Sequence, residues 1–208
     1  MHTHSKETQN KLTPDLAFQF LIEGNDRFVK NLKANRNLLQ QANDTKAGQY
    51  PFATILSCMD SRTSSELIFD QGLGDILSIR IAGNILNDDI IGSMEFATKV
   101  VGTKIILILG HTHCGAIIGA CNNIELGNMN HILFRIKQAI DKETKTIHDR
   151  TGNNTDFVNN VTEINVHLII ARIKRESLII SKLEKEGLIK IVGGMYEVET
   201  GKVTFFEE

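Results

Sequence analysis

Residues 104–115 read KIILILGHTHCG, a short apolar run that leads through a glycine into side chains capable of chemistry. Residues 53–62, ATILSCMDSR, show the same arrangement earlier in the chain. Short β-branched runs bounded by turn residues are typical of buried parallel strands. Ligands bind at the carboxyl ends of the strands in open α/β sheets, so two neighbouring strand ends can direct side chains to one place. The two stretches therefore predict a parallel sheet with a site at the carboxyl ends of its strands.

Three side chains that follow these strands suit a metal ion, namely Cys58, His111 and Cys114. Zinc binds thiolate and imidazole tetrahedrally, and catalytic zinc sites use three protein ligands and a water. His-x-x-Cys can chelate a metal from a single turn, because Gly110 and Gly115 give the backbone conformational freedom on either side. The alternative is that both cysteines are buried core residues, as free cysteines often are. Their placement after two strands, together with the histidine, favours zinc.

The composition is that of an ordinary globular protein, with 208 residues, 41% hydrophobic and 23% charged. This length predicts one domain with a substantial core. A net charge of −2 gives no reason to expect nucleic acid or an anionic membrane as partner. The three cysteines do not form a disulfide framework, and a reducing compartment suits thiolate ligands. Because the N-terminus is polar and no run approaches about eighteen apolar residues, we expect a cytoplasmic protein without a membrane span.

Strands and helices alternate along the chain. Strands are expected at 53–57, 76–81, 104–109 and 188–192, with an edge strand at 203–206 after a hairpin. Helices are expected at 64–69, 87–101, 114–121, 128–145 and 157–186. The pattern predicts an α/β fold in which a mostly parallel central sheet of four strands, plus an antiparallel edge strand, is flanked by helices.

The N-terminal region is expected to differ from the rest. Residues 1–11 are polar and without periodicity, which predicts a flexible tail. Thr13 can cap a helix that has Pro14 in its first turn, and this helix carries a broad apolar face. We expect residues 12–50 to form an N-terminal helical arm of a single domain spanning 12–208, with 31–50 mostly a loop.

Cys58-x-Asp60-x-Arg62, followed by Gly110-His111-x-x-Cys114-Gly115, resembles the zinc signature of the β-class carbonic anhydrases. The similarity extends to the RIAGN sequence at 80–84 and covers roughly residues 12–206. The resemblance implies a zinc-dependent lyase that reversibly hydrates carbon dioxide to bicarbonate and a proton. It also implies a homodimer or a dimer of dimers, in which the helical arm packs on a neighbouring subunit. The alternative for the arm is packing on its own sheet.

The chemistry expected at such a site begins with the metal. Zinc lowers the pKa of a bound water to about 7, which supplies hydroxide as a nucleophile near neutral pH. The resemblance implies that Asp60 either pairs with Arg62, orienting the hydroxide toward carbon dioxide, or moves onto the zinc and turns the enzyme off. We expect the paired form at neutral pH. The alternative is a surface ion pair in a turn, which is worth little energy.

Carbon dioxide is small and apolar, so we expect a narrow hydrophobic slot beside the metal. Ile85 and Val101 are the candidate walls, together with residues of a neighbouring subunit. Gly83 and Gly115 are candidates for bringing backbone amides close to the substrate oxygens.

Some residues near the motif have other interpretations. His113 lies inside the chelating turn and could shuttle protons, but a surface or supporting position is favoured. Cys121 is expected in the core. Some members of the similar family bind inhibitory bicarbonate at a Trp, an Arg and a Tyr. Here Ile55 occupies the Trp position, although Arg80 and Tyr196 match the other two, so we expect an enzyme without this inhibition.

Three rival functions remain open. Hydrolysis of carbon disulfide or carbonyl sulfide uses the same metal site in relatives of the similar family. A non-catalytic zinc protein would close the coordination sphere with a fourth side chain, but structural sites usually draw on paired Cys-x-x-Cys knuckles. A thiol redox protein ranks last, because the chain has no Cys-x-x-Cys.

Overall fold

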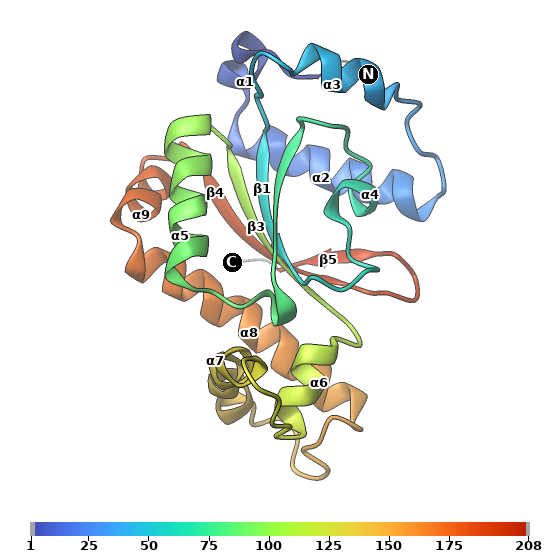
Figure 1. Ribbon diagram of the computed structural model, residues 1–208, viewed down its shortest axis with the longest axis vertical. Coiled ribbons are helices and arrows are strands. Elements are labelled where there is room, and N and C mark those ends of the chain that lie inside the picture. The colour runs from blue at the N-terminus through green and yellow to red at the C-terminus, as the bar shows by residue number, and fades with distance from the viewer. Residues whose placement is uncertain (1–2, 207–208) are drawn as a thin grey trace.

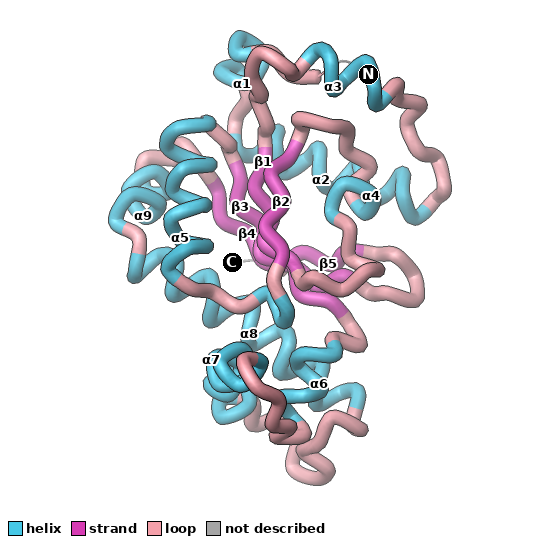
Figure 2. The backbone as a smooth tube through the Cα atoms, viewed as in Figure 1, coloured by secondary structure: helices cyan, strands magenta, loops and turns pink. Residues whose placement is uncertain are grey.

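The computed structural model describes residues 3–206, and its centre is a five-stranded sheet in the order β2-β1-β3-β4-β5. The strands are β1 (Ala53–Ser57), β2 (Ile76–Arg80), β3 (Ile105–His111), β4 (Lys190–Tyr196) and β5 (Val203–Phe205). β1 to β4 pair in parallel, and β5 runs antiparallel to β4 at the edge. Figure 2 shows this sheet inside a shell of helices. The predicted fold class is therefore confirmed.

The helices occupy both faces and both ends of the sheet. They are α1 (Lys6–Lys11), α2 (Pro14–Val29), α3 (Leu38–Asp44), α4 (Ser65–Ile68), α5 (Asp88–Glu95), α6 (Gly115–Cys121), α7 (Met129–Lys142), α8 (Thr155–Glu176) and α9 (Leu178–Lys185), with a 3-10 turn η1 (Ala82–Asn84) and a π-helical segment η2 (Phe96–Val101). In Figure 1, α5, α8 and α9 lie on one side of the sheet and α2 and α4 on the other. α1 and α3 lie beyond one end of the strands, and α6 and α7 beyond the other.

Alternate side chains of β3 build two separate cores. Ile105, Leu107 and Leu109 pack into a cluster with α2, while Ile106 and Ile108 pack into a cluster with α5, α8 and α9. Every residue of β3 is buried, which explains why the run is apolar throughout rather than alternating. Packing on both faces therefore holds β3 in place, and its carboxyl end can position side chains rigidly.

The N-terminal region is more ordered than the sequence suggests. Residues 6–11 form α1, with a capping box between Ser5 and Thr8. Buried Gln9 anchors this helix by donating to the carbonyl oxygens of Pro51 (2.7 Å) and Val101 (3.1 Å). The predicted flexible tail therefore does not describe residues 6–11, and residues 1 and 2 of that prediction lie outside the described residues.

Part of the apolar face of α2 packs on the chain's own sheet. Ala17 and Leu21 are fully buried in the cluster that also contains Phe52 and Leu107. These two side chains do not need a second subunit to cover them. Leu16 and Val29 of the same helix are exposed, so packing of the arm on a neighbouring subunit stays a prediction. The segment 31–50, expected to be mostly loop, also contains α3.

Two predicted helices are interrupted. The helix expected over 157–186 is divided at Ser177, whose hydroxyl accepts from the N–H of Ile180 and caps α9. The helix expected over 87–101 changes to π-helical hydrogen bonding at Phe96. Across residues 3–206, no helix is both long enough and apolar enough to cross a bilayer.

Candidate metal centre

The parallel register of β1 and β3 brings the predicted ligands together. Cys58 directly follows β1, and His111 is the last residue of β3, the neighbouring strand. Cys114 follows three residues later and immediately precedes α6. All three are buried, and their ligand atoms lie within 4.8 Å of one another. Two strand ends thus supply one buried cluster of two sulfurs and an imidazole.

The geometry of this cluster fits zinc. The Sγ atoms of Cys58 and Cys114 are 3.9 Å apart. Two thiolates on one tetrahedral zinc, each with a Zn–S distance of about 2.3 Å, would be separated by about 3.8 Å. The Nδ1 of His111 lies 2.9 Å from the carbonyl oxygen of Thr112, which can only accept, so Nδ1 carries the proton. Nε2 is then left as a buried acceptor without a hydrogen-bond partner in the described part of the chain, and a metal would satisfy it.

The two thiols influence each other's ionisation. A hydrogen bond from Cys114 lowers the pKa of Cys58 against the opposing effect of burial, and the N–H of Gly83, 3.4 Å from Sγ, adds to this. The Cys58 thiolate and burial in turn raise the pKa of Cys114. One of the two sulfurs therefore ionises easily and the second resists. A divalent cation between them removes this conflict, because thiolates bind metal in the deprotonated form.

Asp60 and Arg62 form a two-pronged ion pair beside the cluster. Arg62 donates from Nε to Oδ1 of Asp60 (2.9 Å) and from Nη2 to Oδ2 (2.8 Å), and its backbone N–H also donates to Oδ1. These hydrogen bonds outweigh burial and hold the pKa of Asp60 well below its usual range. Nη2 of Arg62 also lies 3.3 Å from the carbonyl oxygen of His113, which links the dyad to the other ligand loop. The carboxylate is thus ionised and oriented.

Arg80 and Thr63 hold the loop that carries Cys58 and Asp60. Arg80 donates from Nε to the carbonyl of Cys58 (3.2 Å) and from Nη2 to that of Asp60 (2.5 Å). The Thr63 hydroxyl lies 2.9 Å from each of the same two carbonyl oxygens. Sequence reasoning missed both roles. The available signal was the register, since Arg80 ends β2 directly opposite Ser57, the residue before Cys58.

Three of the four candidate substrate residues lie at the cluster. Gly83 has a φ of +65°, and a Cβ there would come within 2.9 Å of Ile136. Glycine takes this conformation without strain, and its N–H approaches the Cys58 sulfur. Ile85 is buried in the same apolar cluster as Cys58 and Cys114. Gly115 is the exposed first residue of α6, with open space around it.

Val101 is not part of this region, and its prediction as a pocket wall is wrong. Its carbonyl oxygen accepts from Gln9, which also bonds Pro51, just before β1. Val101 therefore lies at the amino end of the sheet, whereas the ligands follow the carboxyl ends. The reason is topological: in a parallel sheet, the crossover helix returns the chain to the start of the next strand.

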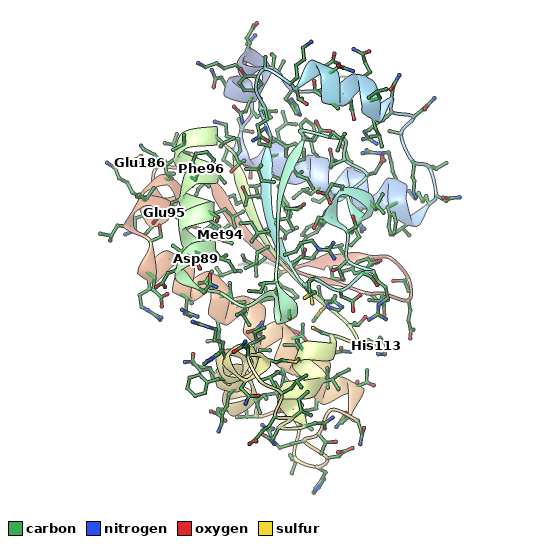
Figure 3. All side chains as sticks on the ribbon, viewed as in Figure 1. Asp89, Met94, Glu95, Phe96, His113 and Glu186 are labelled. Carbon is green, nitrogen blue, oxygen red and sulfur yellow. The ribbon has the colours of Figure 1, made fainter. Side chains whose placement is uncertain are left out.

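His113 and Cys121 lie outside the cluster of candidate metal ligands. His113 has a φ of +57°, and its half-exposed imidazole lies 3.5 Å from the Glu199 carboxylate. Figure 3 shows it on the loop between β3 and α6, at the edge of the molecule. Cys121 is buried in the apolar cluster, where burial raises its pKa to about 11. His113 is thus a surface residue and Cys121 a core residue, as the sequence favours.

Comparisons with known proteins agree with this geometry. A family model described as carbonic anhydrase matches residues 53–203. Carbonic anhydrase 2 of Mycobacterium tuberculosis is 31% identical over 190 residues, which cover 91% of each chain. A carbonic anhydrase of Mycolicibacterium smegmatis is 30% identical over 192 residues, covering 91% of this chain and 92% of the relative.

Solved structures share the fold. A tetrameric β-carbonic anhydrase of Sordaria macrospora superposes with a TM-score of 0.71 at 20% identity, covering 93% of this chain and 98% of that one. A β-carbonic anhydrase of Aspergillus fumigatus gives 0.70 at 23% identity, covering 81% of each chain. With the family match over most of the sequence and relatives similar along nearly their full length, the chain belongs to the β-carbonic anhydrase family.

Proposed function

We propose that this protein is a zinc enzyme that catalyses the reversible hydration of carbon dioxide to bicarbonate and a proton. The observation that carries the proposal is the buried cluster of Cys58, His111 and Cys114 next to the ion pair of Asp60 and Arg62. Both oxygens of Asp60 are held by Arg62, so this carboxylate is not a fourth ligand here. That arrangement favours a catalytic site over a closed structural one.

The chain's own residues have distinct tasks in this proposal. Zinc, held by Cys58, His111 and Cys114, would supply an activated water near neutral pH. Asp60 is an ionised acceptor, so it can take a hydrogen bond from the attacking water and fix the direction of its lone pair. Arg62 keeps the carboxylate in place. Ile85 offers an apolar surface to carbon dioxide, and the exposed backbone at Gly115 is open to the oxygens of bicarbonate.

The proposal extends to the assembly and the compartment. We expect a homodimer or a dimer of dimers, which the tetrameric state named for the Sordaria macrospora enzyme supports. A second copy would supply further walls of the substrate slot. A cytoplasmic location would suit the two thiolates, because a reducing compartment protects them from oxidation.

The test compares wild type with Cys58→Ala in stopped-flow hydration of carbon dioxide, with zinc content measured on the same samples. We expect the variant to lose zinc and at least about a hundredfold in rate, since a ligand matters more than the outer residues that cost 10–100-fold. Cys121→Ala is the matched control, because it removes a buried thiol outside the site and should retain both zinc and rate.

Two outcomes would contradict the proposal. One is a Cys58→Ala variant that keeps its zinc and its rate. The other is a wild-type protein that holds zinc and hydrolyses carbon disulfide or carbonyl sulfide but does not hydrate carbon dioxide.

A further inference from the structure

A cavity of about 440 Å³ lies between α7 and α8, and none of the candidate metal ligands lines it. Its floor is Ile85 and Leu86, with Leu168 of α8 beside them and Phe134 of α7 at the rim. A cavity of this volume is in the range of small-molecule sites. It shares Ile85 with the carbon dioxide surface proposed above, but that function gives no role to its other lining residues.

Basic side chains from two helices face this cavity. Arg135 comes from α7, and Arg172 and Arg175 come from α8. Glu176 is the only carboxylate lining it among the described residues. Arg172 holds both oxygens of Glu176, at 3.1 and 3.0 Å, and Arg175 donates to one of them at 2.6 Å. A single carboxylate is thus shared by two arginines and leaves no negative charge for the third.

Arg135 is the arginine that lacks a counter-charge. Its Nη1 donates to the carbonyl oxygen of Leu86 at 3.2 Å, and Nη1 of Arg172 approaches the same oxygen at 3.4 Å. No carboxylate in residues 3–206 forms an ion pair with Arg135. Two guanidinium groups that converge on one carbonyl repel each other, and a bound anion would convert this repulsion into attraction.

We propose that this cavity binds a phosphate-type oxyanion, either free phosphate or a phosphate monoester, with Arg135 as its main ligand. Nε and Nη2 of Arg135 are not engaged by protein acceptors in the described residues, and this pair of donors matches two oxygens of one phosphate. Arg172 and Arg175 add positive charge from the opposite helix. The apolar floor leaves room for the organic part of an ester.

Isothermal titration of the zinc-loaded protein with inorganic phosphate, at constant ionic strength, tests the site. Arg135→Met removes the charge but keeps the apolar stem, and we expect it to weaken binding at least about tenfold, as loss of a charge-assisted pair should. Lys137→Met is the matched control. It makes the same charge change on the same helix, but Lys137 lines a different cavity, so its affinity should equal that of wild type.

A second variant keeps the test decisive in case Arg135→Met does not fold. Gln138→Glu adds a carboxylate to the cavity wall while Arg135 remains, and we expect a comparable loss of phosphate binding. The proposal is overturned if wild type does not bind phosphate, or if both Arg135→Met and Gln138→Glu bind it as tightly as wild type. The latter result would place the phosphate elsewhere, for example at the metal.

Phenyl phosphate distinguishes the two sources of the anion. Tighter binding of phenyl phosphate than of inorganic phosphate, lost in Arg135→Met, supports a phosphate ester as the ligand. Equal binding of both, with the same dependence on Arg135, supports free phosphate.

Discussion

At the scale of single residues, the geometry of the candidate metal centre depends on backbone carbonyls as much as on side chains. Arg80 and Thr63 fix the carbonyl oxygens of Cys58 and Asp60, and they do so from outside the metal cluster. Such outer contacts orient the ligands of a metal site and tune its affinity. The loop after β1 is therefore prepared for the metal by groups that do not bind it.

Replacing Arg80 with leucine should consequently weaken zinc binding. In this variant only Thr63 still bonds the carbonyl oxygens of Cys58 and Asp60. We expect zinc affinity to fall about 10–100-fold, with a parallel loss of hydration rate. Competition with a chromophoric chelator measures the affinity. Arg80→Lys should recover part of it, because one ammonium can reach one of the two carbonyls. A leucine variant with wild-type zinc affinity would show that Arg80 does not position the loop.

The three candidate ligands could be predicted from sequence because Cys58 and His111 lie at the ends of recognisable strands, and Cys114 follows in the turn after His111. The contacts of Arg80 were missed, because an arginine that bonds backbone carbonyls leaves no pattern of residue types, and only the pairing of β2 with β1 places it opposite Ser57. Val101 differs, because its location could have been inferred. It ends a predicted helix just before the strand predicted at 104–109, so it must lie at the amino end of the sheet.

At the scale of elements, strands were predicted better than helix boundaries. The β-branched runs of β1 and β3 are apolar because both faces of the sheet are covered, so the pattern and the structure have the same cause. The break between α8 and α9 has no such signal, since apolar residues continue on both sides of Ser177. The break depends on tertiary contact, because the Ser177 hydroxyl bonds Glu95 of α5 (2.5 Å) as well as the N–H of Ile180.

Ser177→Ala should therefore destabilise the protein. The substitution removes the cap of α9 and the bond to Glu95 at a buried position, and we expect a loss of about 1–2 kcal/mol in the free energy of unfolding. Urea denaturation measures it. Ser181→Ala, inside α9, is the control and should change stability by less than about 0.5 kcal/mol, because alanine favours a helix interior. Equal effects of the two substitutions would argue against a capping role.

At the scale of the whole molecule, a buried charge cluster joins the N-terminal arm to the domain. Asp70, 4% exposed at its side chain, bonds Arg27 of α2 at 2.5 Å and Arg36, before α3, at 2.6 Å. Burial opposes ionisation of Asp70, but the hydrogen bonds from Arg27, from the N–H of Ala34 and from Arg36 outweigh it, so the pKa lies below its ordinary value. A carboxyl of depressed pKa stabilises the fold above its ordinary pKa, and this contribution is lost as the pH falls through the lower, folded value.

Asp70→Asn should remove this contribution at neutral pH. We expect a loss of about 3 kcal/mol, since the change removes the charge of a buried carboxylate that bonds both Arg27 and Arg36. Asp26→Asn, in an exposed pair with Lys30, should cost less than about 0.5 kcal/mol. Measured by urea denaturation, the difference between Asp70→Asn and wild type should shrink as the pH is lowered below about 4. A difference that stays constant with pH would show that packing, not charge, is responsible.

The free edge of the sheet bears on the proposed assembly. β2 pairs only with β1, so one side of its backbone has no strand partner in residues 3–206. Next to it, a groove of about 700 Å³ between β2, α5 and η2 is lined by Leu77, Ile79 and Phe96. Figure 3 shows Phe96 at the end of α5, on the outside of the molecule. Unpaired edges and exposed apolar grooves are covered in stable proteins, and a second copy of this chain is the partner that the proposed homodimer supplies.

If this edge forms the proposed dimer, Phe96→Glu should yield monomers. The ring is 55% exposed, so the substitution leaves the core intact while it places a charge where the second copy is expected to pack. Light scattering during size-exclusion chromatography gives the mass of the assembly. Phe134→Glu is the matched control, because this ring on α7 is even more exposed, at 75%, and lies away from the β2 edge. If Phe96→Glu remains a dimer while Phe134→Glu dissociates, the subunits meet through α7 and not through the sheet edge. In that case the exposed side chains of Ser78 and Arg80 on β2 would have to protect this edge from aggregation.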